Sequence, residues 1–258
     1  MLTVLSPAKK LSNECYSDTK NPYSPRFLNQ SEELVTQLKQ MDPVDLMSLM
    51  GISEKLATLN WERMQAWNIS FKPNNSREAV YSFQGDTYIG LNVETMDSND
   101  LQFAQDNIRI LSGLYGILRP LDLIMPYRLE MGTKLKNRLG NNLYEYWNDT
   151  LAQSFNKELK SHDSNTVINC ASVEYFKSSP SVQRQLPAGQ FLRWGRTGNN
   201  LCADSPHIGS AFFKHSPQTL LRLRPRYIDD WAHICRSLYR GTWKSSSLSV
   251  KIFESTPE

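Results

Sequence analysis

The segment "LSGLYGILRPLDLIMPYRLEMG", residues 111–132, sets three glycines, two prolines and four charged side chains into an apolar stretch. Glycine allows close backbone approach, and the residue before a proline is disfavoured in a helix. We therefore expect a helix to end at Arg119-Pro120. Glycines and rigid prolines among leucines favour a fixed loop that is suited to a preorganised site.

The four charges of this segment are Arg119, Asp122, Arg128 and Glu130. Buried or half-buried charges cost several kcal/mol unless they are paired. In one interpretation, two arginine–carboxylate pairs only fix the loop. In the other, the loop forms a cleft that binds an anion, with Arg119 or Arg128 as a bidentate donor. Both interpretations stay open.

Two short apolar runs, Leu2–Leu5 and Val167–Cys170, are typical of buried strands. In α/β sheets, ligands bind outside the carboxyl ends of the strands. Ser6 and Lys9 follow the first run, and Lys177 follows the second. Each lysine is either a cleft residue that acts as a base or nucleophile, or a solvated surface charge.

The remaining pattern alternates helices and strands. Strands are expected at 80–83 and 87–91, and helices at about 31–41, 43–49, within 50–67, at 99–112 and at 143–159. Such alternation predicts a mixed α/β fold. We expect a single compact domain with a central sheet, flanking helices and a helix-hairpin-helix-like element.

The hairpin-like element is "LMSLMGISEKLATL", residues 46–59. A glycine turn that leads into a helix exposes backbone N–H groups that suit a phosphate oxygen, and such a contact positions DNA without reading its sequence. Ser53 replaces the pattern's second glycine, and Glu54 brings a negative charge. The alternative is an ordinary αα-hairpin. The candidate DNA-binding residues are Gly51, Ile52, Ser53, Lys55 and Arg63.

Composition narrows the remaining choices. No apolar run approaches the roughly 18 residues of a membrane span, and the start is too short for a secretory signal, which needs about 7–15 apolar residues. We expect a cytoplasmic protein with no membrane partner. The four cysteines form no C-x-x-C pair and the four histidines no H-E-x-x-H motif, so neither a metal site nor a cofactor is expected.

Several stretches together resemble the YaaA family of bacterial peroxide-stress proteins, also called UPF0246. They are the segment 111–132 quoted above, which we call the opening segment, and "LSPAK" at 5–9, "FQGDTYIGL" at 83–91 and "ASVEYFKS" at 171–178. The resemblance implies a cytosolic protein that is induced by hydrogen peroxide and limits oxidative damage linked to free iron. It also implies one compact α/β fold with a positively charged cleft, and a helix-hairpin-helix that binds double-stranded DNA. We place the cleft at Ser6, Lys9, Arg119, Asp122, Tyr127, Arg128, Glu130 and Lys177.

The resemblance covers residues 1–178 and then stops. Lys10 stands where the family usually has threonine, and the strand and basic helix expected after Ser178 are not visible. Residues 179–258 carry 11 Lys and Arg against 5 Asp and Glu, whereas residues 1–178 carry 18 against 21. Our hypothesis is that residues 179–258 are translated out of frame. The alternative is a genuinely divergent tail, whose charge either follows a nucleic acid or keeps the protein in solution.

Three functions compete at this level. The leading one is a peroxide-stress protein that binds double-stranded DNA. The second is an enzyme that acts on a phosphorylated or nucleotide-like small molecule in a Lys/Arg-lined cleft, although no known catalytic signature is present. The third is an interaction protein without chemistry.

Overall fold

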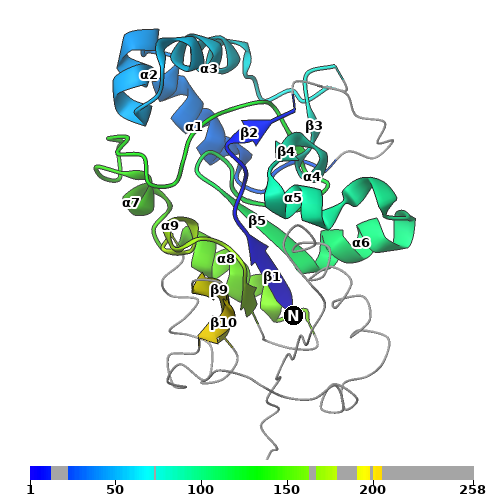
Figure 1. Cartoon of the computed structure of the whole chain (residues 1–258). Helices are drawn as coiled ribbons and strands as arrows, with labels where there is room; N and C mark the ends of the chain where they lie inside the picture. The colour runs from blue at the N-terminus through cyan, green and yellow to red at the C-terminus, as the bar shows by residue number, and fades with distance from the viewer. Residues whose placement is uncertain (13–22, 73, 163–166, 179–190, 198–199, 205–258) are drawn as a thin grey trace, which may run out of the picture.

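The computed structural model describes residues 1–12, 23–72, 74–162, 167–178, 191–197 and 200–204, so most of the segment 179–258 lies outside the described residues. Its centre is a sheet in the order β10-β9-β8-β1-β5-β6, and Figure 1 shows β1 beside β5 within it. The strands are β1 (Leu2–Leu5), β5 (Ile108–Ser112), β6 (Gly116–Leu118), β8 (Val167–Asn169), β9 (Phe191–Thr197) and β10 (Asn200–Asp204). The expected mixed α/β fold with a central sheet is confirmed.

The sheet is parallel at its core and antiparallel at its edges. β1 pairs in parallel with β5 on one side and β8 on the other, and β8 pairs in parallel with β9. β5–β6 and β9–β10 are antiparallel pairs. All four residues of β1 are buried, as expected for a strand covered on both faces.

The chain reverses its direction of travel across the sheet at β1. From β1 it proceeds to β5 on one side, and its next parallel strand, β8, lies on the other side. The carboxyl ends of β1 and β8 therefore lie side by side at a topological switch point, where α/β proteins commonly bind ligands.

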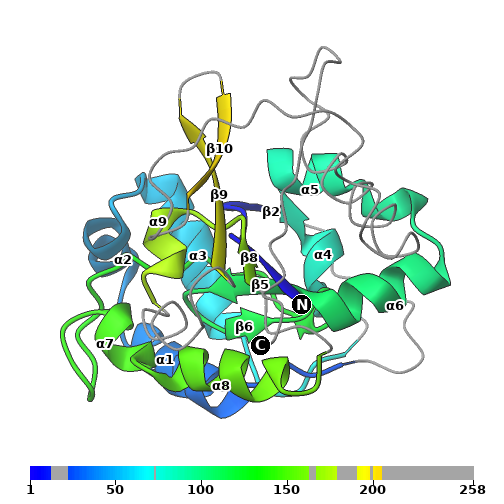
Figure 2. The ribbon, with the colours of Figure 1, turned by 90° about the horizontal axis from the view of Figure 1, so that it is seen from below.

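Helices flank this sheet. They are α1 (Leu28–Leu38), α2 (Pro43–Met50), α3 (Glu54–Ala66), α6 (Ser98–Asn107), α7 (Leu143–Trp147), α8 (Thr150–Leu159) and α9 (Val173–Phe176). Figure 2 shows α8 on one side of the strands and α5 (Asp86–Leu91) on the other. The helices α2 and α3 lie together at one end of the molecule (Figure 1). None of the helices in the described ranges combines the length and apolar character that crossing a lipid bilayer requires.

Two expected strands are wrong. Residues 79–82 form α4 (Ala79–Ser82), and residues 86–91 form α5. In α5, Tyr88 and Leu91 are buried whereas Ile89 is 75% exposed, so burial follows helical spacing instead of alternation. Short strand pairs surround these helices: β2 (Lys10–Leu11) with β4 (Phe83–Gln84), and β3 (Arg77–Glu78) with β7 (Leu123–Ile124). A short 3-10 helix, Val93–Thr95, follows α5.

The helices expected at 99–112 and 143–159 are correct only in part. Helix α6 ends at Asn107, and residues 108–112 form β5 because a fully buried apolar run completes the sheet between β1 and β6. Arg119-Pro120 therefore follows a strand and does not end a helix. The segment 143–159 forms two helices, α7 and α8, which are separated by Asn148 at a φ of 39°.

The glycines of the opening segment allow close approach, as expected. An added Cβ at Gly113 would lie 2.3 Å from the carbonyl oxygen of Leu129. Gly116 has a φ of +69°, and its added Cβ would lie 2.9 Å from both Leu151 and Trp147. The β5–β6 hairpin thus lies directly beneath the loop that carries the charged residues.

Candidate functional site

A hollow of about 550 Å³ lies between the α2–α3 turn, the loop at 128–134 and α9. It is lined by Ser48, Leu49, Met50, Gly51, Arg128, Glu130, Gly132, Thr133, Lys134 and Glu174. These residues come from three parts of the sequence, and the hollow is large enough for a small ligand.

The carboxyl ends of β1 and β8 position α9, which forms one side of the hollow. The backbone N–H of Ser172 donates to Oγ of Ser6 at 2.8 Å, which ties the end of β1 to the start of α9. The hydroxyl of Tyr88 donates to the carbonyl oxygen of Ser6 at 2.8 Å. This contact brings the motifs around Ser6 and Ser172 together at the switch point and orients α9, on which Glu174 lies.

Glu130 bridges two cations. Its Oε2 lies 2.8 Å from Nζ of Lys9, and its Oε1 accepts a hydrogen bond from Nη2 of Arg128 at 2.9 Å. The side chain of Lys9 is 66% exposed, whereas that of Arg128 is 17% exposed. The expected Arg128–Glu130 pair thus exists, and Lys9 joins it.

Arg128 nevertheless keeps unused donors. Glu130 is its only hydrogen-bond partner within the described part of the chain, and its Nε is buried without a partner. A guanidinium has five N–H donors. Arg128 can therefore fill both expected roles: it fixes the loop through Glu130, and its remaining donors can bind an anion.

Glu174 and Lys177 lie on α9 and its C-terminal cap. Oε1 of Glu174 accepts from the backbone N–H of Gly132 at 3.0 Å, and no cation pairs with this carboxylate among the described residues. Nζ of Lys177 lies 5.0 Å from the ring centre of Tyr144, whose hydroxyl donates to the carbonyl oxygen of Glu174 at 3.0 Å. Lys177 is thus beside the hollow but does not line it.

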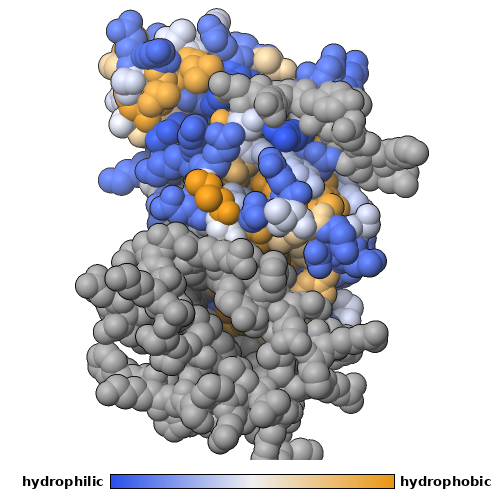
Figure 3. All heavy atoms as spheres, turned by 45° about the vertical axis from the view of Figure 1, so that its right-hand side comes forward, coloured by the Kyte–Doolittle hydropathy of each residue, from blue (hydrophilic) through white to orange (hydrophobic). Residues whose placement is uncertain are grey.

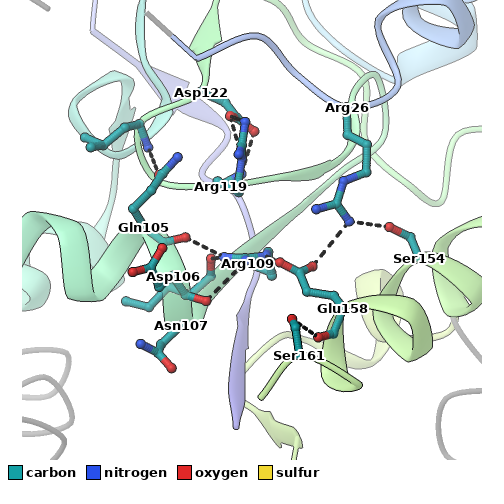
Figure 4. Close-up of polar contacts among 12 residues, drawn as sticks. Arg26, Gln105, Asp106, Asn107, Arg109, Arg119, Asp122, Ser154, Glu158 and Ser161 are labelled. Carbon is teal, nitrogen blue, oxygen red and sulfur yellow. Dashed lines mark hydrogen bonds and ion pairs between the residues drawn. The ribbon is translucent and has the colours of Figure 1, made fainter. Parts of the chain in front are cut away.

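Arg119 and Asp122 are not among the residues that line the hollow. Asp122 is 1% exposed, and its Oδ1 lies 2.8 Å from Nη2 of Arg119. Oδ2 of Asp122 accepts from the backbone N–H of Arg119 at 2.8 Å, and the guanidinium carbon of Arg119 lies 5.0 Å from the ring centre of Tyr23. Burial raises the pKa of Asp122, although the charge of Arg119 opposes that shift. Figure 4 shows this closed pair, so we interpret both residues as structural.

Tyr127 is buried in the core. Its hydroxyl is hydrogen-bonded to Oγ of Ser112 at 2.7 Å, and burial raises its pKa. Its ring meets that of Tyr115 edge to face, with the ring centres 5.1 Å apart. Tyr127 therefore supports the loop from beneath and does not line the hollow.

The α2–α3 hairpin turns at Gly51, which has a φ of 61° and caps α2. Ser53 precedes α3, but its side chain makes no capping hydrogen bond. The N–H groups of Glu54, Lys55 and Leu56 have no hydrogen-bond partner within the described residues, which leaves the positive end of the α3 dipole open to an anion.

The charge of the hairpin opposes such an anion. Residues 42–66 carry four acidic side chains and two basic ones, Lys55 and Arg63. The hairpin also has an exposed apolar face, and Figure 3 shows hydrophobic side chains gathered at this end of the molecule. Its members are Val44, Met47, Leu56 and Leu59, which are 37–65% exposed.

Seven of the ten lining residues were not among the expected site residues, and three of the seven have polar side chains and lie outside the hairpin: Thr133, Lys134 and Glu174. Glu174 lies inside the motif "ASVEYFKS", and the other two directly follow the opening segment. Proximity to those motifs was the available signal. Among the described residues, no group of three or more His, Cys, Asp and Glu side chains is placed to hold a metal ion.

Comparison with known proteins assigns the chain to a family. A family model described as peroxide stress protein YaaA matches residues 1–199. A UPF0246 protein of Hahella chejuensis is 51% identical over 187 residues, which are 72% of this chain and 73% of the relative. A UPF0246 protein of Idiomarina loihiensis is 52% identical over 178 residues, 69% of each chain. A third, from Magnetococcus marinus, is 48% identical over 192 residues, 74% of each chain. The chain belongs to the YaaA (UPF0246) family of peroxide stress proteins.

Proposed function

We propose that this protein acts in the cytoplasm during peroxide stress, and that it binds double-stranded DNA and so limits oxidative damage linked to free iron. The family supports the stress role. The observation that favours DNA is the uncapped start of α3 beside the Gly51 turn, where three backbone N–H groups lack partners among the described residues. Such donors suit a phosphate oxygen.

The cations near the turn extend this surface. Lys55 is exposed on the first turn of α3, and Gly51 shares the lining of the hollow with Arg128 and Lys134. Because residues 42–66 carry more acids than bases, side-chain charge contributes little attraction, and the contact depends on the backbone amides. We therefore expect weak, sequence-independent binding that decreases steeply with salt.

The test measures duplex affinity over a salt series. Lys55→Glu should weaken binding and lower the salt slope by about one, and Gly51→Asp should weaken it by placing a carboxylate at the turn. Glu54→Gln should strengthen binding, because it removes a negative charge from the first turn of α3. Lys160→Glu, a charge reversal at the far end of α8, is the matched control. Unchanged affinity in all three hairpin variants would mean that the hairpin does not contact DNA.

A second candidate function is an enzyme that acts on a phosphorylated or nucleotide-like small molecule. The unused donors of Arg128 favour it, because a guanidinium binds phosphate in a bidentate manner. Calorimetric titration with ATP checks it: binding that Arg128→Gln abolishes would support this function. No heat of binding in the parent chain would exclude ATP as a ligand.

A further inference from the structure

We propose that the hollow binds a small zwitterion, namely a free α-amino acid with an apolar side chain. In this arrangement the α-carboxylate is bound by Arg128 and Thr133, and the ammonium group by Glu174. The inference concerns a different ligand from DNA and does not depend on the hairpin contact.

The binding site of the ligand's α-carboxylate is inferred from two side chains with unused hydrogen-bonding capacity. Arg128 is 17% exposed in its side chain and uses Nη2 toward Glu130, while no other donor of its guanidinium has a partner among the described residues. Thr133 is 8% exposed and lines the hollow, and its hydroxyl likewise has no hydrogen-bond partner in the described ranges. Nε of Arg128 is buried without a partner, whereas buried polar groups normally have one. A carboxylate would supply acceptors to both.

The ammonium end follows from Glu174. Its carboxylate is held by one backbone N–H, that of Gly132, and no described cation neutralises it. The position is constrained, because an added Cβ at Gly132 would lie 3.1 Å from Oε1 of Glu174. A fixed carboxylate without a cation is the complement of an ammonium group.

The balance of charge favours a zwitterion over a polyanion in this hollow. Its lining side chains are two cations, Arg128 and Lys134, and two carboxylates, Glu130 and Glu174. Lys9 and Arg128 already neutralise Glu130. A triphosphate would therefore meet the uncompensated charge of Glu174, whereas a zwitterion satisfies both signs.

The walls define the rest of the ligand. Leu49 and Met50 line the hollow near the Gly51 turn and provide an apolar surface, which suits an aliphatic side chain. The loop is rigid, since Glu130 is tied to Lys9 and Arg128 and the hairpin at Gly113 supports it from beneath. A preformed site loses little free energy to ordering when a ligand binds.

The experiment titrates the full chain with four probes by calorimetry: leucine, leucinamide, 4-methylpentanoate and inorganic triphosphate. Leucinamide keeps the ammonium group without the carboxylate, and 4-methylpentanoate keeps the carboxylate without the ammonium group. Leucine should bind, each half-probe should bind at least about tenfold more weakly, and triphosphate should not compete. Equal affinity for leucine and 4-methylpentanoate, tighter binding of triphosphate, or no binding of leucine would overturn the proposal.

Two variants assign the ends of the ligand. Arg128→Gln should weaken binding of leucine and of 4-methylpentanoate alike. Glu174→Gln should weaken binding of leucine but not that of 4-methylpentanoate, because 4-methylpentanoate has no ammonium group to lose its partner. Lys160→Gln is the remote control, and circular dichroism checks that each variant folds. If Glu174→Gln leaves leucine affinity intact, the ammonium assignment is wrong. Because Glu174 belongs neither to the hairpin nor to the cations that extend the DNA surface, its variant separates loss of leucine binding from loss of DNA binding.

Discussion

Gly113 has no side chain, which lets the loop that carries the candidate site pack directly against the β5–β6 hairpin. Its added Cβ would lie 2.3 Å from the carbonyl oxygen of Leu129 and 3.0 Å from the carbonyl carbon of Glu130. Both contacts are backbone atoms, which cannot move aside as a flexible side chain would. The β5–β6 hairpin therefore fixes where Glu130 and, through it, Arg128 lie.

We predict that Gly113→Ala lowers the free energy of unfolding by about 1–3 kcal/mol, because it overpacks a closed contact. Urea denaturation measures the change. Gly51→Ala is the comparison, since no atom lies within 4 Å of its added Cβ and only its φ of +61° is strained. That variant should cost about 1 kcal/mol. Equal, small effects at both positions would show that the 129–130 backbone yields easily.

Glu158 is the second residue with a clear expected effect. It accepts from Nε of Arg109 at 2.8 Å and lies 3.2 Å from Nη1 of Arg26 (Figure 4). Burial favours the neutral acid, but the hydrogen bonds and charges of the two arginines outweigh it, so the pKa of Glu158 lies below its ordinary 4.5. A lowered folded-state pKa means that the unfolded chain binds the proton more readily.

The stabilisation by Glu158 is therefore complete above about pH 4.5 and is lost as the pH falls through the lower, folded-state pKa. Glu158→Gln should cost about 3 kcal/mol at neutral pH, because it leaves the buried charge of Arg109 without its partner. Thermal unfolding across an acid series checks this. The difference between parent and variant should narrow on acidification, and a constant difference would contradict the ionic origin.

At the residue scale, the sequence predicted local pairs better than distant ones. The Arg119–Asp122 and Arg128–Glu130 pairs exist because each lies within one short loop. Glu174 lines the hollow because α9 packs against Gly132, whose N–H donates to the Glu174 carboxylate. No local sequence pattern predicts this contact between distant parts of the chain. Tyr127 was expected in the cleft, but its polar hydroxyl is satisfied inside the core by Ser112.

Helices that bury only one face were predicted correctly from the sequence. Segments that pair into the central sheet were not, because the sheet imposes a strand on a sequence with helical spacing. The helix expected at about 43–49 is α2, and its start has both a capping box at Asp42 and a proline at the first helical position. Residues 108–112 continue an apparent helical stripe, but they pair with β1 and β6 as a strand. The pairing with β1 rests on residues far away in the chain, so helical spacing alone could not reveal it.

The break between α7 and α8 supplies an element-scale prediction. Asn148 has a φ of 39° and a ψ of −130°, a region that favours glycine, whereas Asn92 has a φ of 49° and a ψ of 50°, which asparagine tolerates. Asn148→Gly should raise the free energy of unfolding by about 1 kcal/mol, since it removes backbone strain. Asn92→Gly should change it little. Chemical denaturation compares the two exposed sites, and an equal response would contradict strain at Asn148.

At the scale of the whole molecule, the segment 179–258 needs an explanation. The family model matches residues 1–199, and the relatives match between 69% and 74% of both chains. A similar share of this chain and of each relative is therefore left unmatched. We propose that residues 1–178 form the family domain and that the segment 179–258 is a divergent region translated out of frame.

We expect resequencing of the gene to find an insertion or deletion near the codons that follow Ser178. Correction of that change should yield a C-terminal sequence that aligns with the last quarter of the relatives. An intact reading frame through this region would show that the tail is genuine. In that case its excess of 11 basic over 5 acidic residues becomes available to DNA, and its removal should lower the salt slope of binding.

The central place of β1 has a consequence for how the chain is made. This strand leaves the ribosome before its partner strands, since Thr3 pairs with Ile108 and Leu2 pairs with Val167. Its backbone N–H and C=O groups therefore stay unpaired until these distant strands have been synthesised, and long-range parallel pairing forms slowly. We expect the apolar side chains of β1 to stay exposed, and so open to aggregation, until translation has passed β8.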